Sequence, residues 1–296
     1  MKFDDITALV GNTPTVGIHS LSPKPGVRIW AKLEGQNPTG SVKDRIALAM
    51  ITGAERAGDL SGDRILLEPT SGNTGISLAF MARRKGYRIV CVVPETASSE
   101  RSQMLKVFGA EIVYSPGSEG SNGAIKLARQ MAEDSKYLML YQYGNPANPG
   151  AHYETTGPEI LRDVPELTHF VAGLGTGGTL TGVGRYLKER KPEVKIVAAE
   201  PEQGDLVYGL RSLEDGFIPE VLDPSVLDRK IKVNAANSVT WTQALAGIGV
   251  FAGISCGATV YVARRIAEAI ETGDIVCLFA DGGWKYLSTQ LWTMSA

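Results

Sequence analysis

Lys43 is the residue whose type and position point most clearly to chemistry in this sequence. It lies in PTGSVKDR, residues 38–45, after a Pro-Thr-Gly turn and at the start of an apolar stretch that predicts a helix. Positive charge is disfavoured at a helix N-terminus, and partial burial lowers the pKa of an amine further. Such an amine is suited to attack an aldehyde and form a Schiff base. The alternative is a structural lysine that reaches solvent and pairs with Asp44, and this segment alone leaves both open.

Three glycine-rich turns each follow a strand-like run and precede a helix-like one, so each would direct free backbone N–H groups at an anion. The first, at 35–44, contains Lys43, but two residues separate the lysine from the second glycine, so the P-loop pattern fails. The second, PTSGNTGISLAF at 69–80, is rich in hydroxyl and amide groups and suits a carboxylate. The third, GLGTGGTLTG at 173–182, contains several threonines and suits one compact phosphate.

The third turn also fits a dinucleotide-binding pattern. Gly173, Gly175 and Gly178 satisfy G-x-G-x-x-G, and Glu200 follows at about the distance of a ribose-binding acid. Taken alone, the turn leaves NAD and a single phosphate open as ligands. We predict that the dinucleotide pattern is coincidental, because the threonine hydroxyls suit a single phosphate.

The elements that must position these turns alternate along the chain. Short β-branched runs are followed by amphipathic stretches, which predicts parallel sheets covered by helices. The predicted strands are 27–33, 64–68, 88–93, 111–115, 168–173, 195–200 and 275–280, and predicted helices include 44–58 and 123–134. The segment 141–153, rich in Asn, Pro and Gly, is the best boundary between two domains. We expect a smaller domain at 38–145 and a larger one formed by 1–37 and 146–296.

The composition limits the classes of function. The 296 residues are 43% hydrophobic and 21% charged, with a net charge of −2 and a pI of about 6.0, which favours neither nucleic acid nor membrane as a partner. The apolar runs are too short to span a bilayer and no signal peptide is present, so we expect a cytoplasmic protein. The cysteines and histidines lack disulfide or metal-ligand spacing, so we expect no metal site. Cys91 and Cys277 lie in apolar runs and are expected to be buried.

Six ordered segments resemble the cysteine synthase branch of fold-type II pyridoxal phosphate enzymes. They are GNTP (11–14), KLEGQNPTGSVKDR (32–45), PTSGNTG (69–75), HYETTGPEI (152–160), GLGTGGTLTG (173–182) and GISCGA (253–258). The resemblance covers about residues 6–289. It implies an α/β fold of two domains, each with a parallel-type sheet covered by helices and with the active site between them. It also implies pyridoxal 5′-phosphate as cofactor, a mobile smaller domain and a homodimer.

The resemblance assigns roles to individual residues. Lys43 would hold the cofactor as a Schiff base and would also remove the α-proton of the substrate. Asn73 would bond the cofactor's ring hydroxyl, and Ser255 would face its pyridine nitrogen. The phosphate would be held by Gly175, Thr176, Gly177, Gly178 and Thr179, and the substrate carboxylate by Thr70, Ser71, Gly72 and Thr74. Cys256 stands where family members often have Ser or Thr, and we interpret it as a small-residue substitution.

The implied reaction is β-replacement on an activated serine. The β-substituent leaves, an α-aminoacrylate remains on the cofactor, and a sulfur nucleophile adds to give L-cysteine. The segments YQYGNPAN (141–148), 205–220 and 281–288 resemble the cysteine synthase B type, especially an actinobacterial branch that prefers O-phosphoserine. That branch takes sulfur from a thiocarboxylated carrier protein, whereas free sulfide is the alternative donor. Relatives in the branch have a longer C-terminal tail, which weakens this finer assignment.

Arg211 is the residue that would recognise O-phosphoserine. A guanidinium group holds a phosphate dianion through two parallel hydrogen bonds. The alternative is a surface ion pair of Arg211 with Glu214 or Asp215. Two further enzymatic alternatives on the same fold are a cystathionine β-synthase and a serine/threonine dehydratase. A non-catalytic dinucleotide or metabolite sensor is the alternative of another class.

Overall fold

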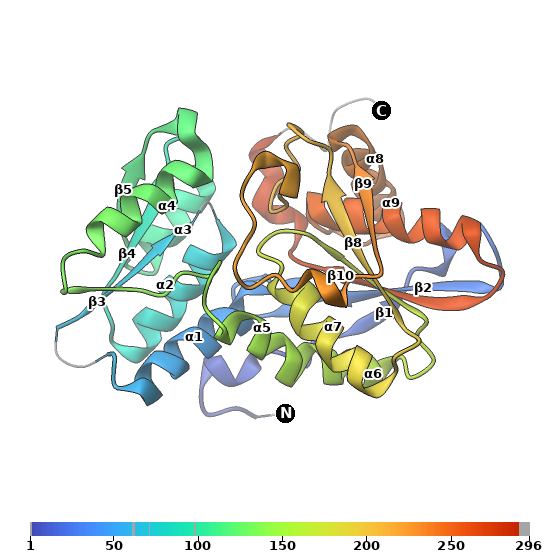
Figure 1. The fold of residues 1–296 in the computed structure, drawn as a ribbon, viewed down its shortest axis with the longest axis horizontal. Coiled ribbons are helices and arrows are strands. Elements are labelled where there is room, and N and C mark those ends of the chain that lie inside the picture. Colours follow the sequence, from blue (N-terminus) through green and yellow to red (C-terminus); the bar gives the residue numbers. More distant parts are fainter. Residues whose placement is uncertain (1, 61–62, 71, 98, 290–296) are drawn as a thin grey trace.

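Two sheets, each in its own half of the molecule, form the framework of the protein in the computed structural model (Figure 1). The structure describes residues 2–60, 63–70, 72–97 and 99–289. The half that contains the smaller sheet is called the smaller half, and the other is called the larger half. The smaller sheet has the order β5-β4-β3-β6 and is entirely parallel. Its strands are β3 (Ile65–Pro69), β4 (Ile89–Pro94), β5 (Glu111–Ser115) and β6 (Tyr137–Met139).

The larger sheet combines both ends of the chain. Its order is β1-β2-β10-β7-β8-β9, and only the pairing of β1 with β2 is antiparallel among the described strands. Its strands are β1 (Thr15–Gly17), β2 (Val27–Leu33), β7 (His169–Gly173), β8 (Lys195–Pro201), β9 (Arg229–Val233) and β10 (Gly273–Phe279). The fold is therefore α/β with one parallel and one mixed sheet.

Helices cover both sheets (Figure 1). They are α1 (Lys43–Ala57), α2 (Asn73–Lys85), α3 (Ser99–Val107), α4 (Gly120–Met131), α5 (Ala147–Ala151), α6 (Gly157–Asp163), α7 (Gly178–Arg190), α8 (Ala235–Gly247) and α9 (Ile254–Ala269). A π-helical turn spans His152–Thr156, and 3-10 turns span Ile6–Leu9, His19–Leu21, Glu34–Gln36, Gly117–Glu119, Leu213–Asp215, Pro224–Val226 and Gly283–Thr289. In the part of the chain that the structure describes, no helix combines the length and apolarity that a membrane span requires.

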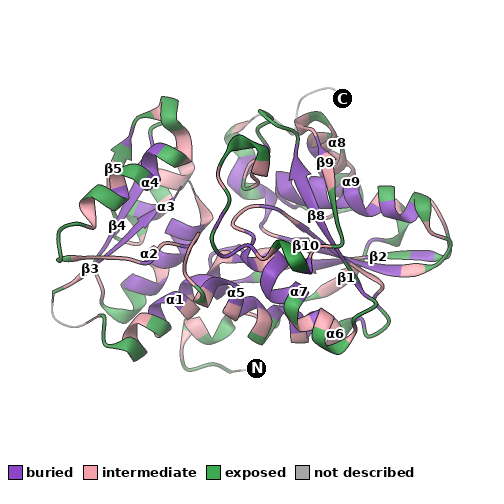
Figure 2. Cartoon of the chain, in the orientation of Figure 1, coloured by how far each residue is buried: buried purple, intermediate pink, exposed green. Residues whose placement is uncertain are grey.

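The central strands, such as β3, β4, β8 and β10, are buried on both faces, which explains their continuous apolar runs. In β3, Leu66 packs in one core cluster together with residues of α1 and α2, whereas Leu67 packs in another together with residues of α4. Figure 2 shows the central strands of both sheets as buried. Cys91 and Cys277 lie within these strands and are fully buried, as predicted.

The sequence located all the central strands and missed three edge strands. Each of the seven predicted strands is present, with its ends shifted by at most two residues. The missed strands β1, β6 and β9 lie at sheet edges and are three to five residues long. An edge strand need not be apolar throughout, as the charged RKIKV of β9 illustrates. The boundaries of the two domains and the mobility of the smaller one stay predictions.

Candidate active site

A cavity of about 380 Å³ is lined by residues of both halves of the molecule. It lies at the carboxyl ends of β3, β7 and β10, since Thr70, Gly173 and Ala280 all line it. Ligand sites of α/β sheets are commonly found at this end of the strands. Most of the predicted site residues meet here: Lys43, Thr70, Gly72, Asn73, Thr74, Gly175, Thr176, Gly177, Thr179, Arg211 and Ser255 line the cavity. Ser71 falls outside the described residues, and Gly178 lies behind the cavity wall.

Lys43 is the first residue of α1. It lines the cavity, and its side chain is half-buried. Burial lowers the pKa of its amine, although the charges of Asp281 and Glu34 oppose the shift. Its Nζ forms no hydrogen bond or ion pair with any residue that the structure describes. Asp44, the alternative partner, accepts hydrogen bonds from the backbone and the hydroxyl of Thr39 instead. Lys43 is therefore an amine without an acidic partner among the described residues.

Arg45, two residues further along the same turn, is fully engaged. Its guanidinium bonds both carboxylate oxygens of Glu34, at 2.7 and 2.8 Å, and both of Glu159, at 2.8 and 2.7 Å. Lys32 joins the network through Glu159 and Asp163, each at 3.0 Å. Burial raises the pKa of Glu159, but the hydrogen bonds and charge of Arg45 outweigh it and bring that pKa to about 2. This buried network anchors α1 to the larger half and so fixes the position of Lys43.

The turn between β7 and α7 presents donors to the cavity. The backbone N–H groups of Thr176, Gly177 and Thr179 form no hydrogen bond with any described residue. They lie at the N-terminus of α7, where the helix dipole also favours an anion. The turn is thus an anion cradle whose backbone donors could hold a phosphate group.

Glycine is required at two positions of this turn. Gly177 has φ +82°, and a Cβ there would lie 2.7 Å from the Cβ of Leu222. A Cβ on Gly178 would lie 1.9 Å from Oδ1 of Asn148, so Gly178 packs against the protein and supports the cradle from behind. Of the predicted phosphate-binding residues that the structure describes, Gly178 alone does not line the cavity.

The turn between β3 and α2 forms the opposite wall. Thr70 Oγ1 accepts hydrogen bonds from the N–H groups of Gly72, at 3.2 Å, and Gly75, at 3.1 Å, and so caps α2. Thr74 donates its hydroxyl proton to Oε1 of Gln142 at 2.6 Å. Sequence reasoning missed Gln142, because its segment was interpreted as a domain boundary and as part of the family resemblance, without a role for this residue.

Asn73 is held by residues of the other half of the molecule. Its Nδ2 donates to Oδ2 of Asp281 at 2.7 Å, and its Oδ1 accepts from Nζ of Lys285 at 2.8 Å. Tyr286 also donates to Oδ2 of Asp281, at 2.7 Å, whereas the buried Oδ1 has no hydrogen-bond partner among the described residues. Burial lowers the pKa of Lys285 to about 8. These contacts fix the orientation of the Asn73 amide, and the only signal for them in the sequence is the group of polar residues that follows β10.

Ser255 lies in the first turn of α9 and lines the cavity, and its hydroxyl forms no hydrogen bond with any described residue. The next residue, Cys256, is fully buried and does not line the cavity. Its Sγ lies 3.6 Å from the backbone oxygen of Asp281, and burial raises the pKa of the thiol to about 12. Cys256 is thus an inert packing residue, in line with the prediction of a small-residue substitution.

Arg211 lines the cavity and has no carboxylate partner among the described residues. Its Nη1 donates to Oδ1 of Asn122 at 3.2 Å, and its guanidinium carbon lies 5.4 and 4.5 Å from the ring centres of Tyr143 and Phe217. The alternative surface pair with Glu214 or Asp215 is not formed. Arg101, which sequence reasoning missed, is a second arginine that lines the cavity.

Glu200 is directed away from the cavity. It accepts a hydrogen bond from the N–H of Leu213 at 2.9 Å and pairs with Lys232 at 3.2 Å and Lys230 at 3.5 Å. It does not line the cavity. The acid of the apparent dinucleotide pattern therefore serves the larger half as a structural anchor.

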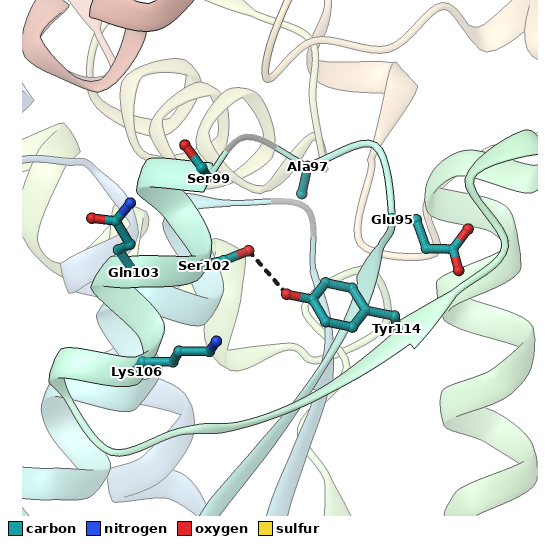
Figure 3. Close-up of a pocket in the computed structure, with 7 residues that line it drawn as sticks. All are labelled: Glu95, Ala97, Ser99, Ser102, Gln103, Lys106 and Tyr114. Carbon is teal, nitrogen blue, oxygen red and sulfur yellow. Dashed lines mark hydrogen bonds between the residues drawn. The ribbon is translucent and has the colours of Figure 1, made fainter.

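A second cavity, of about 480 Å³, lies in the smaller half between α3 and β5 (Figure 3). Ser102 and Tyr114, which share a hydrogen bond of 3.4 Å, are part of its wall. None of the predicted site residues that the structure describes lines it. Within the described ranges, no group of three or more His, Cys, Asp or Glu side chains is arranged to hold a metal ion.

Comparisons with known proteins point to one enzyme family. The family model "Pyridoxal-phosphate dependent enzyme" matches residues 6–281. A cysteine synthase of Staphylococcus aureus is 44% identical over 301 residues, which cover 98% of this chain and 97% of the relative. Cysteine synthase B of Salmonella typhimurium is 42% identical over 282 residues, which cover 95% of this chain and 93% of the relative.

Solved structures show the same fold. An O-ureido-L-serine synthase superposes with a TM-score of 0.94 at 40% identity, covering 100% of this chain and 97% of that one. A cysteine synthase of Entamoeba histolytica superposes with a TM-score of 0.94 at 34% identity, and the match covers 100% of this chain and 92% of that one.

Proposed function

We propose, from the premise that the chain belongs to the family of pyridoxal-phosphate dependent enzymes, that it is a cysteine synthase. It would replace the β-substituent of an activated serine by a sulfur nucleophile and release L-cysteine. The observation that supports this most strongly is the meeting of three features in one cavity. These are the Lys43 amine, which has no acidic partner among the described residues, the anion cradle at Gly175–Thr179 and the polar turn that includes Thr70 and Thr74.

Pyridoxal phosphate is the cofactor of this family, and the residues of the cavity fit it. Lys43 would hold it through Nζ, and the cradle before α7 would bind its phosphate. Asn73 and Ser255 are polar groups of the same cavity that would bond its ring. When bound, the cofactor withdraws electrons from the α-carbon of the amino acid and so acidifies the α-proton.

Lys43 would then move that proton. Burial lowers the pKa of the Lys43 amine and so favours its neutral form, and a neutral amine can accept a proton at Nζ. Ser255 would offer a neutral hydroxyl, in place of a carboxylate, to the ring nitrogen, and such a partner would not favour protonation of that nitrogen. Closure of the smaller half over the cavity would keep water away during the reaction.

O-phosphoserine is the activated serine that we propose. Arg211 supports this choice because its guanidinium lines the cavity without neutralisation by a described carboxylate. Such a group binds a phosphate dianion and stabilises the phosphate as it leaves, whereas a neutral acetyl ester offers it no charge. Either sulfide or a thiocarboxylated carrier protein would supply sulfur to a cytoplasmic homodimer.

The test is a panel of substrates with the purified, pyridoxal phosphate-loaded enzyme. Cysteine formation with sulfide should have its highest kcat/KM with O-phosphoserine, lower with O-acetylserine and lowest with L-serine. A preference for O-acetylserine would contradict the assignment of Arg211 and leave cysteine synthesis standing. No cysteine from any of the three would contradict the function, and parallel reactions with homocysteine or hydroxyurea would show whether another nucleophile is used.

A further inference from the structure

We propose that Glu68 is a positioning residue for the amino-acid substrate, because it fixes the backbone of Tyr141 and Gln142 at the cavity wall. Glu68 does not touch the cavity itself. It would act through Gln142, which lines the cavity beside Thr74. The inference rests on the proposed function, in which this wall binds the carboxylate of the substrate.

Glu68 is held by two backbone donors. It is the penultimate residue of β3, and none of its surface is exposed. Its Oε2 accepts the N–H of Tyr141 at 2.7 Å, and its Oε1 accepts the N–H of Gln142 at 3.0 Å. One carboxylate thus fixes two successive peptide groups of the segment that follows β6.

The fixed segment is strained at Tyr141. This residue has φ +56°, in the left-handed region that L-residues other than Gly rarely adopt. The chain turns sharply here, because the N–H groups of Gly144 and Asn145 both bond the backbone oxygen of Tyr141, at 3.0 Å. The two hydrogen bonds to Glu68 are interactions that hold the strained residue in place.

Gln142 links the fixed backbone segment to the cavity. Its Oε1 accepts the hydroxyl proton of Thr74 at 2.6 Å, and both side chains line the cavity. A shift of the backbone at Gln142 would break this contact and move two polar side chains of the predicted carboxylate site. Glu68 therefore fixes the geometry of that site through the backbone of Gln142, without lining the cavity itself.

A second Glu-Pro pair in the molecule shows what a purely structural acid looks like. Glu200 also precedes a proline at the end of a strand, β8, and is also fully buried. It is neutralised by Lys232 and Lys230. Glu68 has no cationic partner among the described residues, and its burial raises its pKa to about 8 despite its two backbone donors. A buried carboxylate without a cation is costly to keep, which fits a role in the site and not in the general stability of the fold.

The experiment compares steady-state kinetics of the loaded enzyme with those of Glu68→Gln. The amide is nearly isosteric but accepts at one position only, so it leaves one of the two N–H groups without an acceptor. We expect KM for O-phosphoserine or O-acetylserine to rise roughly 5- to 150-fold, while kcat changes far less and the cofactor absorbance is unchanged. Glu68→Asp, which keeps both carboxyl oxygens on a shorter side chain, should raise KM less and serves if Glu68→Gln does not fold.

Asp228→Asn is the matched control. Asp228 also accepts a backbone N–H, that of Ile196 at 2.8 Å, but at the start of β8, away from the cavity. It should alter the melting temperature without changing KM. An unchanged KM in folded Glu68→Gln, or an equal rise in Asp228→Asn, would overturn the proposal.

Hydrogen exchange separates this inference from the proposed function. The amides of Tyr141 and Gln142 should exchange faster in Glu68→Gln than in the wild type, whatever reaction the enzyme performs. If the wild type makes no cysteine but exchange is faster, the anchoring role stands and the proposed function fails. If exchange at these amides is unchanged, the anchoring role fails.

Discussion

Lys43 and Arg45 are two residues apart in the first turn of α1, yet their surroundings are opposite. Arg45 makes four charge-assisted hydrogen bonds to Glu34 and Glu159, in a network that is almost fully buried. Lys43 faces the cavity and has no acidic partner among the described residues. The difference separates two uses of buried charge: a paired charge fixes a helix, and an unpaired charge is available for chemistry.

Arg45→Met should give the largest effect of the variants that test this difference. Removing one member of a buried charge network leaves the others uncompensated, so we expect the free energy of unfolding to fall by about 3–5 kcal/mol. Urea unfolding of the loaded enzyme measures it. The control is Arg185→Met, because the pair of Arg185 with Asp223 is exposed and should contribute about 1 kcal/mol or less. Equal losses in both variants would contradict a structural role specific to Arg45.

Arg211→Ala tests the cation that we assign to substrate specificity. A charge-assisted contact to phosphate, made through two hydrogen bonds, contributes about 2–4 kcal/mol, so kcat/KM with O-phosphoserine should fall roughly 30- to 1000-fold. The value with O-acetylserine should change little. Equal losses with the two substrates would mean that Arg211 is structural, like Arg45.

Thr74→Ala tests the wall opposite the phosphate cradle. The lost hydroxyl contact should weaken amino-acid binding by about 1–3 kcal/mol while the absorbance of the bound cofactor stays normal. Titration with the amino-acid substrate measures this, and Thr74→Ser, which keeps the hydroxyl, is the control. Loss of the cofactor with unchanged amino-acid affinity would refute a substrate-binding role for this turn.

The smallest effect concerns the pH dependence of the Arg45 network. The pKa of Glu159 is about 2 in the folded protein, below its usual 4.5, because the effect of Arg45 outweighs burial. The stability that this pair contributes is therefore fully present above about pH 4.5 and is lost as pH falls towards 2. Thermal melts of Glu159→Gln should show a flatter decline over this window than the wild type, whereas the exposed Glu154→Gln should follow the wild type.

Local patterns in the sequence predicted the helix-mouth position of Lys43, the turn before α7 and every central strand. These features depend on residues that are neighbours in the chain, so spacing and residue type reveal them. The contact between Asn73 and Asp281 joins residues 208 positions apart, and no local pattern encodes it. The same applies to Glu68, whose partners Tyr141 and Gln142 come from a segment that the sequence marked as a domain boundary.

Covalent attachment of the cofactor to Lys43 is the central claim, and Lys285 is the rival amine. Lys285 is also buried and its pKa is lowered to about 8, but its Nζ is bonded to Asn73. Borohydride reduction of the loaded enzyme, followed by mass spectrometry of its peptides, identifies the lysine that holds the cofactor. We predict the pyridoxyl group on Lys43 and its absence from Lys43→Ala. A pyridoxyl group on Lys285, or on any other lysine of the wild type, would contradict the account.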